Sequence, residues 1–265
     1  MMSHQSHLSL LMVPNLFVTT LILFVIVVVR YFALAGLAYW LCWVKFNKKL
    51  GARRIQAARP DRKWVRREIL WSLLSSVIFA LSGTAGLYAW ERGWTLVYLE
   101  IPTYGWFYFF ASILLLAFLH DTYFYWTHRL MHLPGFFKWF HQIHHDSKNP
   151  TPWAAFSFHP LEACVEAIIL PVFVFILPLH PAALLVFLTA MTVFGIINHL
   201  GYELYPLNFS RHWLWRWVIS ATHHDQHHRL YKNNLGLYFT WWDHWMGTEH
   251  QGYPDAFDKY SSQKV

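Results

Sequence analysis

Long apolar runs constrain the fold of this chain more than any other feature of its sequence. They cover residues 16–44, 69–90, 104–126, 161–177 and 182–197. A helix needs about 20 apolar residues to cross the hydrocarbon core, where its backbone groups must bond within the helix itself. With 56% hydrophobic and only 13% charged residues, the chain does not fit an ordinary soluble domain. We therefore predict an all-α, polytopic membrane protein.

The number of membrane helices stays open between four and five. The first run is too long for a single span and contains Arg30, so its boundaries are uncertain from sequence. The last two runs are short and are separated by Pro178 and Pro181. They are expected to form a membrane hairpin over 161–198 that either spans fully or enters part-way.

A basic loop sets the expected orientation. Residues 45–67 contain ten lysines and arginines, with Asp61 as the only acid among them. Short loops of this kind lie on the cytoplasmic side of membranes. The net charge of +7 comes largely from this loop, so it indicates membrane orientation and contact with anionic lipid headgroups. Nucleic acid is not an expected partner. Following the runs from this loop brings the histidine-rich segments to the same cytoplasmic face.

Three histidine clusters carry the chemical signal. Their members are spaced three or four residues apart, which places side chains on one face of a helix. The clusters are HRLMH (His128, His132), HQIHH (His141, His144, His145) and HHDQHH (His223, His224, His227, His228). Eight imidazoles on such stripes exceed the three or four that one zinc ion takes, so the spacing indicates two metal ions. The alternative is a set of scattered histidines or a compositional bias.

The type of ligand limits which metal ions the clusters can bind. Coordination rich in histidine and poor in carboxylate excludes Mg²⁺ and Ca²⁺, and no His-Glu-x-x-His string of a zinc protease is present. Paired haems would need histidines within the apolar runs, and a metal transporter would need ionisable groups in its spans. Iron that activates O2 against C–H bonds of a lipid is favoured. The rival from another class is a non-catalytic metal-binding or transport protein of the membrane.

Six strings carry a resemblance to a known family. HDTYFYWTHRLMH, HQIHHDS, FHPLE, NHLGYE, THHDQHH and NLGLYFTWWDHWMGT, between His120 and Gly247, resemble the fatty acid hydroxylase superfamily. They are most similar to its sterol desaturase branch, which includes C-5 sterol desaturases, C-4 sterol methyl oxidases and alkylglycerol monooxygenases. The resemblance implies a non-haem di-iron centre with O2 as co-substrate. Its expected ligands are His128, His132, His141, His144, His145, His199, His224, His227 and His228, and no catalytic residue beyond the metal ligands is predicted.

The same resemblance implies an oxidoreductase that desaturates or hydroxylates a membrane lipid, with a sterol or a related lipid expected first. A fatty acid or alkylglycerol hydroxylase is the alternative within the superfamily. The chain contains no His-Pro-Gly-Gly motif of a fused cytochrome b5 domain. A separate electron-donor protein of the cytochrome b5, ferredoxin or reductase type is therefore expected.

Five further residues are candidates for supporting the ligands. His120 precedes Asp121 near the end of the third apolar run, where a ligand, a partner of a ligand and a helix-end histidine are equally good interpretations. His223 borders the third cluster off its stripe. Asp146 and Asp225 each follow a cluster histidine, where a carboxylate can hold an imidazole in the right tautomer, although a solvated acid is nearly as good an interpretation. Glu203 follows His199 by four positions and would share its face if the segment were helical.

The expected organisation has three parts. Residues 1–127 form the N-terminal membrane helices with the basic loop, 120–250 form the catalytic region, and 251–265 form a C-terminal tail. A cap built from residues 128–160 and 200–265 would hold the two irons. A C-terminus without a dilysine or KDEL-type signal favours a bacterial inner membrane, or the endoplasmic reticulum if the source is eukaryotic. Cys42 and Cys164 are expected to be buried small side chains without a disulfide.

Overall fold

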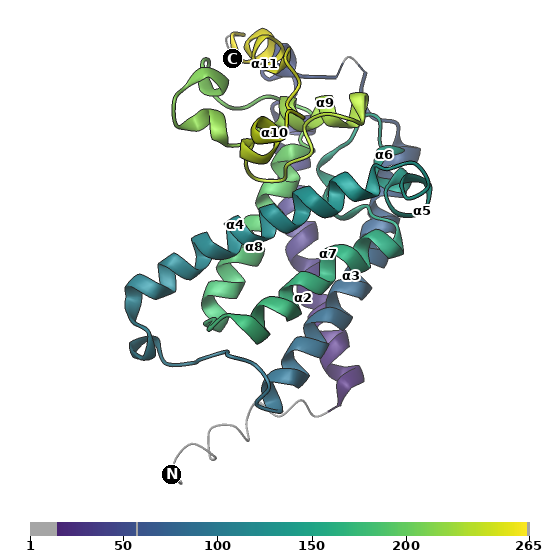
Figure 1. Cartoon of the computed structure of the whole chain (residues 1–265). Coiled ribbons are helices and arrows are strands. Elements are labelled where there is room, and N and C mark those ends of the chain that lie inside the picture. The colour runs from purple at the N-terminus through teal and green to yellow at the C-terminus, as the bar shows by residue number, and fades with distance from the viewer. Residues whose placement is uncertain (1–14, 57, 264–265) are drawn as a thin grey trace.

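The structure, a computed structural model, describes residues 15–56 and 58–263, and helices joined by loops make up this part of the chain (Figure 1). Only isolated β-bridges, Arg54 with Tyr202 and Val218 with Phe239, occur among these residues. The all-α prediction is confirmed for the described part.

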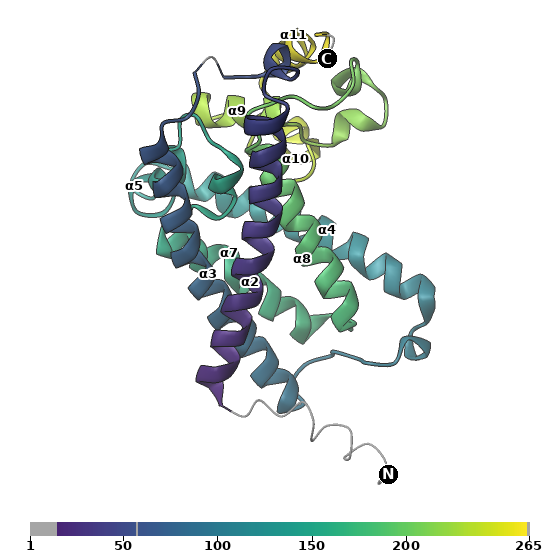
Figure 2. The ribbon, with the colours of Figure 1, turned by 180° about the vertical axis from the view of Figure 1, so that it is seen from behind.

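Two long helices run side by side along one flank of the molecule (Figure 2). Helix α2 spans Leu16–Tyr39 and continues without a break into the π-helical turn Trp40–Lys45, so the first apolar run forms a single 30-residue helix. Helix α3 spans Arg62–Glu91 and begins where the Asp61 side chain accepts a hydrogen bond from the Lys63 backbone N–H. An acidic side chain at this position satisfies a free amide and favours the positive end of the helix dipole.

Three more helices cross the molecule beside this pair. They are α4 (Gly105–Met131), α7 (Pro160–Ile176) and α8 (Pro181–Asn198). The last two begin alike, because His159 and His180 each accept a backbone N–H through Nδ1 and are followed by proline at the first helical position. Proline there has the correct φ and loses no hydrogen bond. These two helices cover the segment 161–198 over which a membrane hairpin is predicted, and residues Leu177–His180 join them.

Four helices of the described part are long and apolar enough to cross a membrane: the continuous helix Leu16–Lys45, α3, α4 and α8. Helix α7 is not one of them, since it has only 17 residues and carries Glu162 and Glu166. Of the four or five membrane helices predicted from the sequence, four agrees with this finding. An apolar cluster between α4, α7 and α8 joins these helices through Leu116, Ile169, Phe173, Val174, Leu179, Phe187 and Tyr238.

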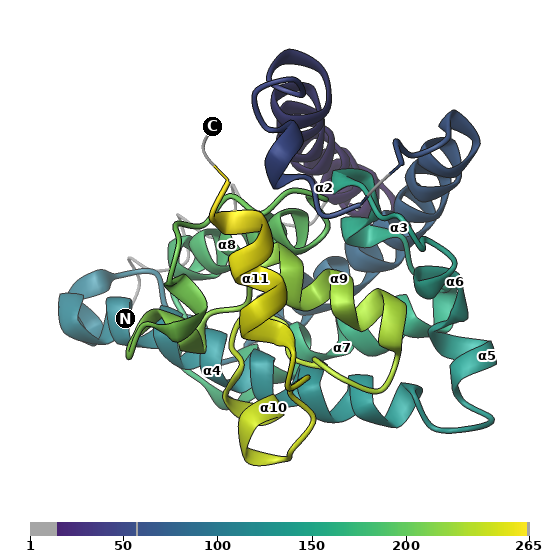
Figure 3. The ribbon, with the colours of Figure 1, turned by 90° about the horizontal axis from the view of Figure 1, so that it is seen from above.

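Short helices gather at one end of the long ones and form the cap. They are α5 (Phe137–Phe140), α6 (Gln142–His145), α9 (Ala221–Leu230), α10 (Trp241–Trp245) and α11 (Tyr253–Ser261). Seen from above, α9 and α11 lie next to each other, and α9 also contacts α8 (Figure 3). The segment predicted as a tail therefore contains a helix, and its Tyr253 and Phe257 are buried against Phe209.

The basic loop lies against this cap. Ile55 donates its backbone N–H to Gly201, and the Gln56 side chain donates to Asp225. Arg53 donates to five backbone carbonyls, those of Glu203, Leu204, Tyr205, Ser261 and Gln263. The loop thus connects the membrane helices α2 and α3 to two distant parts of the cap.

Both cysteines are free, as predicted. Cys42 is buried in a small cluster with Trp43, Leu200 and Tyr202. The burial predicted for Cys164 is wrong, because its position on α7 faces outward and its side chain is exposed. Cys164 lies on the outer surface of the helix bundle. The sequence does not distinguish an apolar position on that surface from one in the core of the bundle.

Candidate metal centre

Nine buried or half-buried histidines form two groups that could each hold a metal ion. Group one contains His128, His132, His141, His145 and His227, and group two contains His144, His199, His224 and His228. In each group the ligand nitrogens all lie within 4.8 Å of one another. These are the nine histidines that the sequence and its family resemblance predicted as ligands, now brought together from α4, α6, α9 and the ends of α5 and α8.

The nitrogens in each group point at one another at short range. In group one, Nε2 of His128 lies 2.8 Å from Nε2 of His141, and Nε2 of His145 lies 3.0 Å from Nε2 of His227. In group two, Nε2 of His199 lies 3.2, 3.0 and 3.2 Å from Nε2 of His144, His224 and His228. One ring nitrogen carries one proton or one lone pair, so His199 cannot satisfy three such contacts by hydrogen bonding.

A cation at the centre of each group would account for this convergence. Two nitrogens that each lie about 2.1 Å from one ion are about 3.0 Å apart when they subtend a right angle. The observed separations match that value, and the atoms that converge are neutral imidazole nitrogens, which bind first-row transition metals. The residues present therefore fit a pair of metal ions.

The two groups adjoin each other. The rings of His141 and His144, one from each group, are stacked with centroids 5.2 Å apart, and those of His145 and His228 are 4.9 Å apart. Two ions held here would be neighbours in one centre.

Two of the three histidine clusters of the sequence are divided between the groups, whereas His128 and His132 of the first both enter group one. His141 and His145 of the second cluster enter group one, whereas His144 enters group two. In the third cluster His227 enters group one, and His224 and His228 enter group two. The prediction of one shared helical face per cluster therefore holds only in part. The second cluster is also not on one helix, because His141 precedes α6.

Hydrogen bonds on the far side of the rings fix their orientation. Nδ1 of His128 donates to the Leu235 carbonyl at 2.7 Å, Nδ1 of His227 to the Asn233 carbonyl at 2.8 Å, and Nδ1 of His199 to the Gly195 carbonyl at 2.6 Å. A carbonyl can only accept, so each of these rings carries its proton on Nδ1. The Nε2 lone pair is then free to bind a metal ion, as is usual for histidine ligands.

A carboxylate performs the same task for His141. Its Nδ1 lies 2.5 Å from Oε1 of Glu162, and both side chains are 2% exposed. Helix α7 thus reaches the metal centre through its first turn. Glu162 was quoted in the FHPLE string but not predicted as a supporting residue, because nothing local in the sequence links it to His141.

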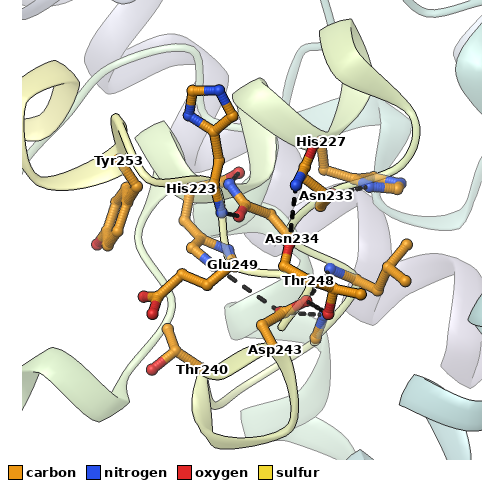
Figure 4. Close-up of polar contacts among 12 residues, drawn as sticks. His223, His227, Asn233, Asn234, Thr240, Asp243, Thr248, Glu249 and Tyr253 are labelled. Carbon is orange, nitrogen blue, oxygen red and sulfur yellow. Dashed lines mark hydrogen bonds and ion pairs between the residues drawn. The ribbon is translucent and has the colours of Figure 1, made fainter. Parts of the chain in front are cut away.

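The loop after α9 is built around Asp243 and positions two of these carbonyls (Figure 4). Asp243 accepts the backbone N–H groups of Leu235 and Gly236 at 2.7 and 2.8 Å and the Thr248 hydroxyl at 2.7 Å. Gly236 is needed here, since a Cβ would lie 2.4 Å from the Phe239 carbonyl oxygen. Asp243 therefore positions the Leu235 carbonyl that receives the His128 proton.

The neighbouring Asn234 completes this loop. Its side-chain amide donates to the His223 carbonyl and to Gln226 on α9, and its side-chain oxygen accepts the His250 backbone N–H. Neither Asn234 nor Asp243 was predicted as a site residue. The signal for both lies only in the NLGLYFTWWDHWMGT string, whose role depends on contacts with α9.

The five predicted supporting residues have other partners. His120 is within 3.2 Å of the Tyr238 hydroxyl, and His223 is enclosed between Asp243 and the Tyr253 ring. Asp146 pairs with Arg67, and Asp225 pairs with Arg229 and Gln56, so neither carboxylate holds an imidazole in place. These five side chains belong to neither histidine group.

Glu203 also differs from its expected position. Helix α8 ends at Asn198, and Gly201 follows with φ +76, so His199 and Glu203 do not share a helical face. A side chain at Gly201 would collide with the Trp43 ring, because a Cβ there would lie 2.5 Å from it. Glu203 instead accepts the Thr222 backbone N–H and hydroxyl at the start of α9.

Burial keeps the ligand histidines neutral. It lowers the pKa of His199 to about 4, with the hydrogen bond to the Gly195 carbonyl opposing the shift. It lowers the pKa of His144 and His228 well below the usual value, helped by neighbouring histidines. Neutral imidazole is the form that binds a metal ion, so the centre needs no proton release from these residues at neutral pH.

The comparison with known proteins agrees with this geometry. A family model described as fatty acid hydroxylase matches residues 113–248, which include all nine histidines. The chain belongs to the fatty acid hydroxylase family. The resemblance found in its sequence motifs is thereby confirmed.

Relatives within the fatty acid hydroxylase family carry sterol names. The chain is 35% identical to a Delta(7)-sterol 5(6)-desaturase of Gibberella zeae over 62% of its length and 49% of the relative's. It is 31% identical to a Delta(7)-sterol 5(6)-desaturase of Aspergillus fumigatus over 76% and 68%, and 31% identical to a lathosterol oxidase of Rattus norvegicus over 68% and 59%. The alignments thus span about half to two thirds of these relatives. No solved structure shows significant similarity to the chain.

Proposed function

We propose that this chain is a non-haem di-iron enzyme that uses O2 to desaturate or hydroxylate a membrane lipid. The observation that carries the proposal is the pair of adjoining histidine groups, whose nitrogens converge in two sets of five and four. They stand at one end of helices that are long and apolar enough to cross a membrane. A lipid can reach such a centre from within the bilayer.

Iron is the metal that this donor set and family membership favour. Imidazole donors suit it, and when bound it supplies the O2 chemistry that oxidises unactivated C–H bonds. The nine ligands would be the histidines of groups one and two. All of them except the half-buried His132 are buried.

The chain's own residues prepare this centre. Glu162 and the carbonyls of Leu235, Asn233 and Gly195 hold protons on the outer nitrogens, so the inner nitrogens face the centre as lone pairs. Tyr231 stacks on the His145 ring with centroids 4.6 Å apart and shields that side. Burial of the rings excludes bulk water from the site.

A sterol or a related lipid is the proposed substrate, because the three relatives named above act on sterols by name. The alternative is a hydroxylase acting on a fatty acid or an alkylglycerol, and the description of the family model supports the fatty acid. Both reactions need electrons from outside, and we propose a separate donor protein. The basic loop and the cap would then lie on the cytoplasmic side, in a bacterial inner membrane or the endoplasmic reticulum.

Lipid profiling by mass spectrometry, with and without the gene, tests the proposal. A product lighter by two hydrogens indicates desaturation, and one heavier by one oxygen indicates hydroxylation. Purified protein should contain about two irons per chain, in line with its two ligand groups.

Two results would contradict this proposal. Two irons per chain without reductant-dependent O2 uptake on any lipid would favour a metal-binding or transport protein. A single zinc ion per chain would overturn the iron assignment.

A further inference from the structure

A strained turn ends helix α9 beside the metal centre. Tyr231 has φ +65° and ψ −36°, and the Lys232 backbone N–H donates across it to the Leu230 carbonyl at 2.7 Å. A γ-turn with positive φ is rare and strained, and a bulky side chain seldom occupies it. The other non-glycine residues with positive φ in the described part are Asn208 and Asn234, and asparagine tolerates this conformation.

The Tyr231 side chain lies against a metal ligand. Its ring stacks on the His145 ring, with centroids 4.6 Å apart and planes inclined by 24°. Phe137 lies against both rings, with its centroid 5.7 Å from that of Tyr231 and 5.5 Å from that of His145. Strained backbone conformations cluster at functional sites, and this one directs the Tyr231 ring to the face of His145.

His145 lacks a restraint that three other ligands of group one have. Nδ1 of His128, His141 and His227 is bonded in each case to a carbonyl or a carboxylate oxygen. Nδ1 of His145 is buried and has no hydrogen-bond partner among the described residues. A ligand histidine is normally oriented through this outer nitrogen, so another contact has to orient the His145 ring. The stacked Tyr231 ring supplies such a contact.

We propose that Tyr231 is a positioning residue for the metal ligand His145, whose ring it holds by stacking and not by a hydrogen bond. This inference rests on the proposed function in so far as the histidine groups bind metal. His145 belongs to group one, and within the described part of the chain the Tyr231 ring stacks on no histidine of group two. Removal of the ring should therefore weaken the ion in group one alone.

Titration of metal-free, full-length protein in detergent with iron(II), under anaerobic conditions, tests the assignment. Tyr231→Asn tolerates the positive φ but removes the ring. It should weaken one of the two ions about 10- to 100-fold, as is typical of changes next to a ligand, and leave the other within about twofold. Tyr231→Phe keeps the ring that makes these contacts, so it should bind both ions within about twofold of the wild type.

A merely structural role would give a different result. Helix α9 supplies ligands to both groups, so a general loosening of this helix in Tyr231→Asn would weaken both ions together. In the His144→Ala background, where group two is incomplete, Tyr231→Asn should still weaken the ion that remains. Tyr260→Asn, at a partly exposed ring on α11, is the matched control and should bind both ions as the wild type does.

Three results would overturn the inference: equal weakening of both ions in Tyr231→Asn, unchanged binding of both ions by that variant, or weakened binding in Tyr231→Phe. A wild-type protein that takes up no iron would overturn the inference together with the proposed function. Two bound ions, of which Tyr231→Asn weakens one, would support the inference even if the loaded protein oxidised no lipid. The two proposals can therefore fail separately.

Discussion

The direction in which each imidazole ring faces decides what these histidines can do. Rings such as His128 and His199 hold their protons on the outer nitrogen through backbone carbonyls, which leaves the inner nitrogen free. Nδ1 of His145, His224 and His228 has no such partner among the described residues. Metal binding would hold these three rings through Nε2 alone.

Removal of one ligand from each group gives a direct test at this scale. His144→Ala leaves three imidazoles in group two, and His227→Ala leaves four in group one. Both variants should lose turnover by more than the roughly 10- to 100-fold typical of outer-shell changes, and His144→Ala should retain about one iron per chain. Metal analysis and product formation measure the two effects. His244→Ala, at an exposed histidine, is the control, and full turnover in either ligand variant would show that the ligand set is wrong.

Glu162 gives a second prediction for a single residue. Without its carboxylate, Nδ1 of His141 loses the partner at 2.5 Å that fixes its tautomer. Glu162→Ala should lower iron affinity or activity by about 10- to 100-fold, and Glu162→Gln should recover part of this because its side-chain oxygen still accepts. Iron titration of the metal-free protein distinguishes the variants. Equal affinity in Glu162→Ala and wild type would exclude the role.

The sequence predicted the nine converging histidines because helical spacing and motif resemblance are local signals. Glu162, Asn234 and Asp243 were missed, since their importance comes from contacts between distant segments. Asp146 and Asp225 were chosen for being adjacent to histidines, but their side chains point toward Arg67 and Arg229. A carboxylate that follows a histidine in sequence does not have to face that histidine's ring.

At the scale of elements, the basic loop fastens the cap to the membrane helices. Arg53 is the main contact, because its guanidinium donates to carbonyls before α9 and at the end of α11. An arginine with several fixed donors suits this task better than a lysine.

Arg53→Ala should therefore loosen α11 and the segment 203–205. The loss of these hydrogen bonds is expected to cost about 1–3 kcal/mol, reduced by the partial exposure of the side chain. That corresponds to roughly 2–4 °C of melting temperature per kcal/mol. Hydrogen exchange of α11 and thermal unfolding measure the effect, with exposed Lys48→Ala as the matched control. Unchanged exchange in α11 would contradict the role of Arg53.

The boundaries of the long helices followed from hydropathy. Run 69–90 lies within α3, run 104–126 begins one residue before α4, and the ends of runs 161–177 and 182–197 lie within one residue of those of α7 and α8. The end of α8 decides where Glu203 lies. Gly201 turns the chain after this helix and so separates Glu203 from His199. The Trp43 ring leaves no room for a side chain at this turn, a contact that hydropathy cannot predict.

At the scale of the whole molecule, the cap concentrates buried histidines that are neutral in the folded state. Burial lowers the pKa of His199 to about 4 and that of His223 to about 3, whereas the unfolded chain keeps values near 6.5. As pH falls below about 6.5 the unfolded state takes up protons that the folded state does not, so stability falls.

The metal-free protein should therefore lose stability between pH 7.5 and about 5. At about pH 5.5, each histidine of this kind lowers the free energy of unfolding by about 1.4 kcal/mol, which follows from one pH unit below the unfolded value. Thermal unfolding of metal-free protein in detergent across this range measures the slope. A melting temperature that is constant from pH 7.5 to 5 would contradict the buried, neutral state of these rings.

The arrangement of the whole chain was predictable to the level of topology. A basic loop followed by apolar runs predicted that all three clusters meet at one end of the molecule, and they do (Figure 1). The division of the second and third clusters between two groups could not be predicted, since it depends on contacts between distant segments such as that of His145 with His227.

The division of the clusters has a mechanical consequence. His145 and His227 are 82 positions apart, and His144 and His199 are 55 apart, yet their ring nitrogens nearly touch. An ion held by such a pair closes a long loop of the chain, as a covalent cross-link does, and restricts the unfolded state by the same entropy. Two ions would cross-link α4, α6, α8 and α9. A chelator would remove these cross-links, and added metal would restore them. The centre would then govern not only the reaction but also whether the cap stays assembled.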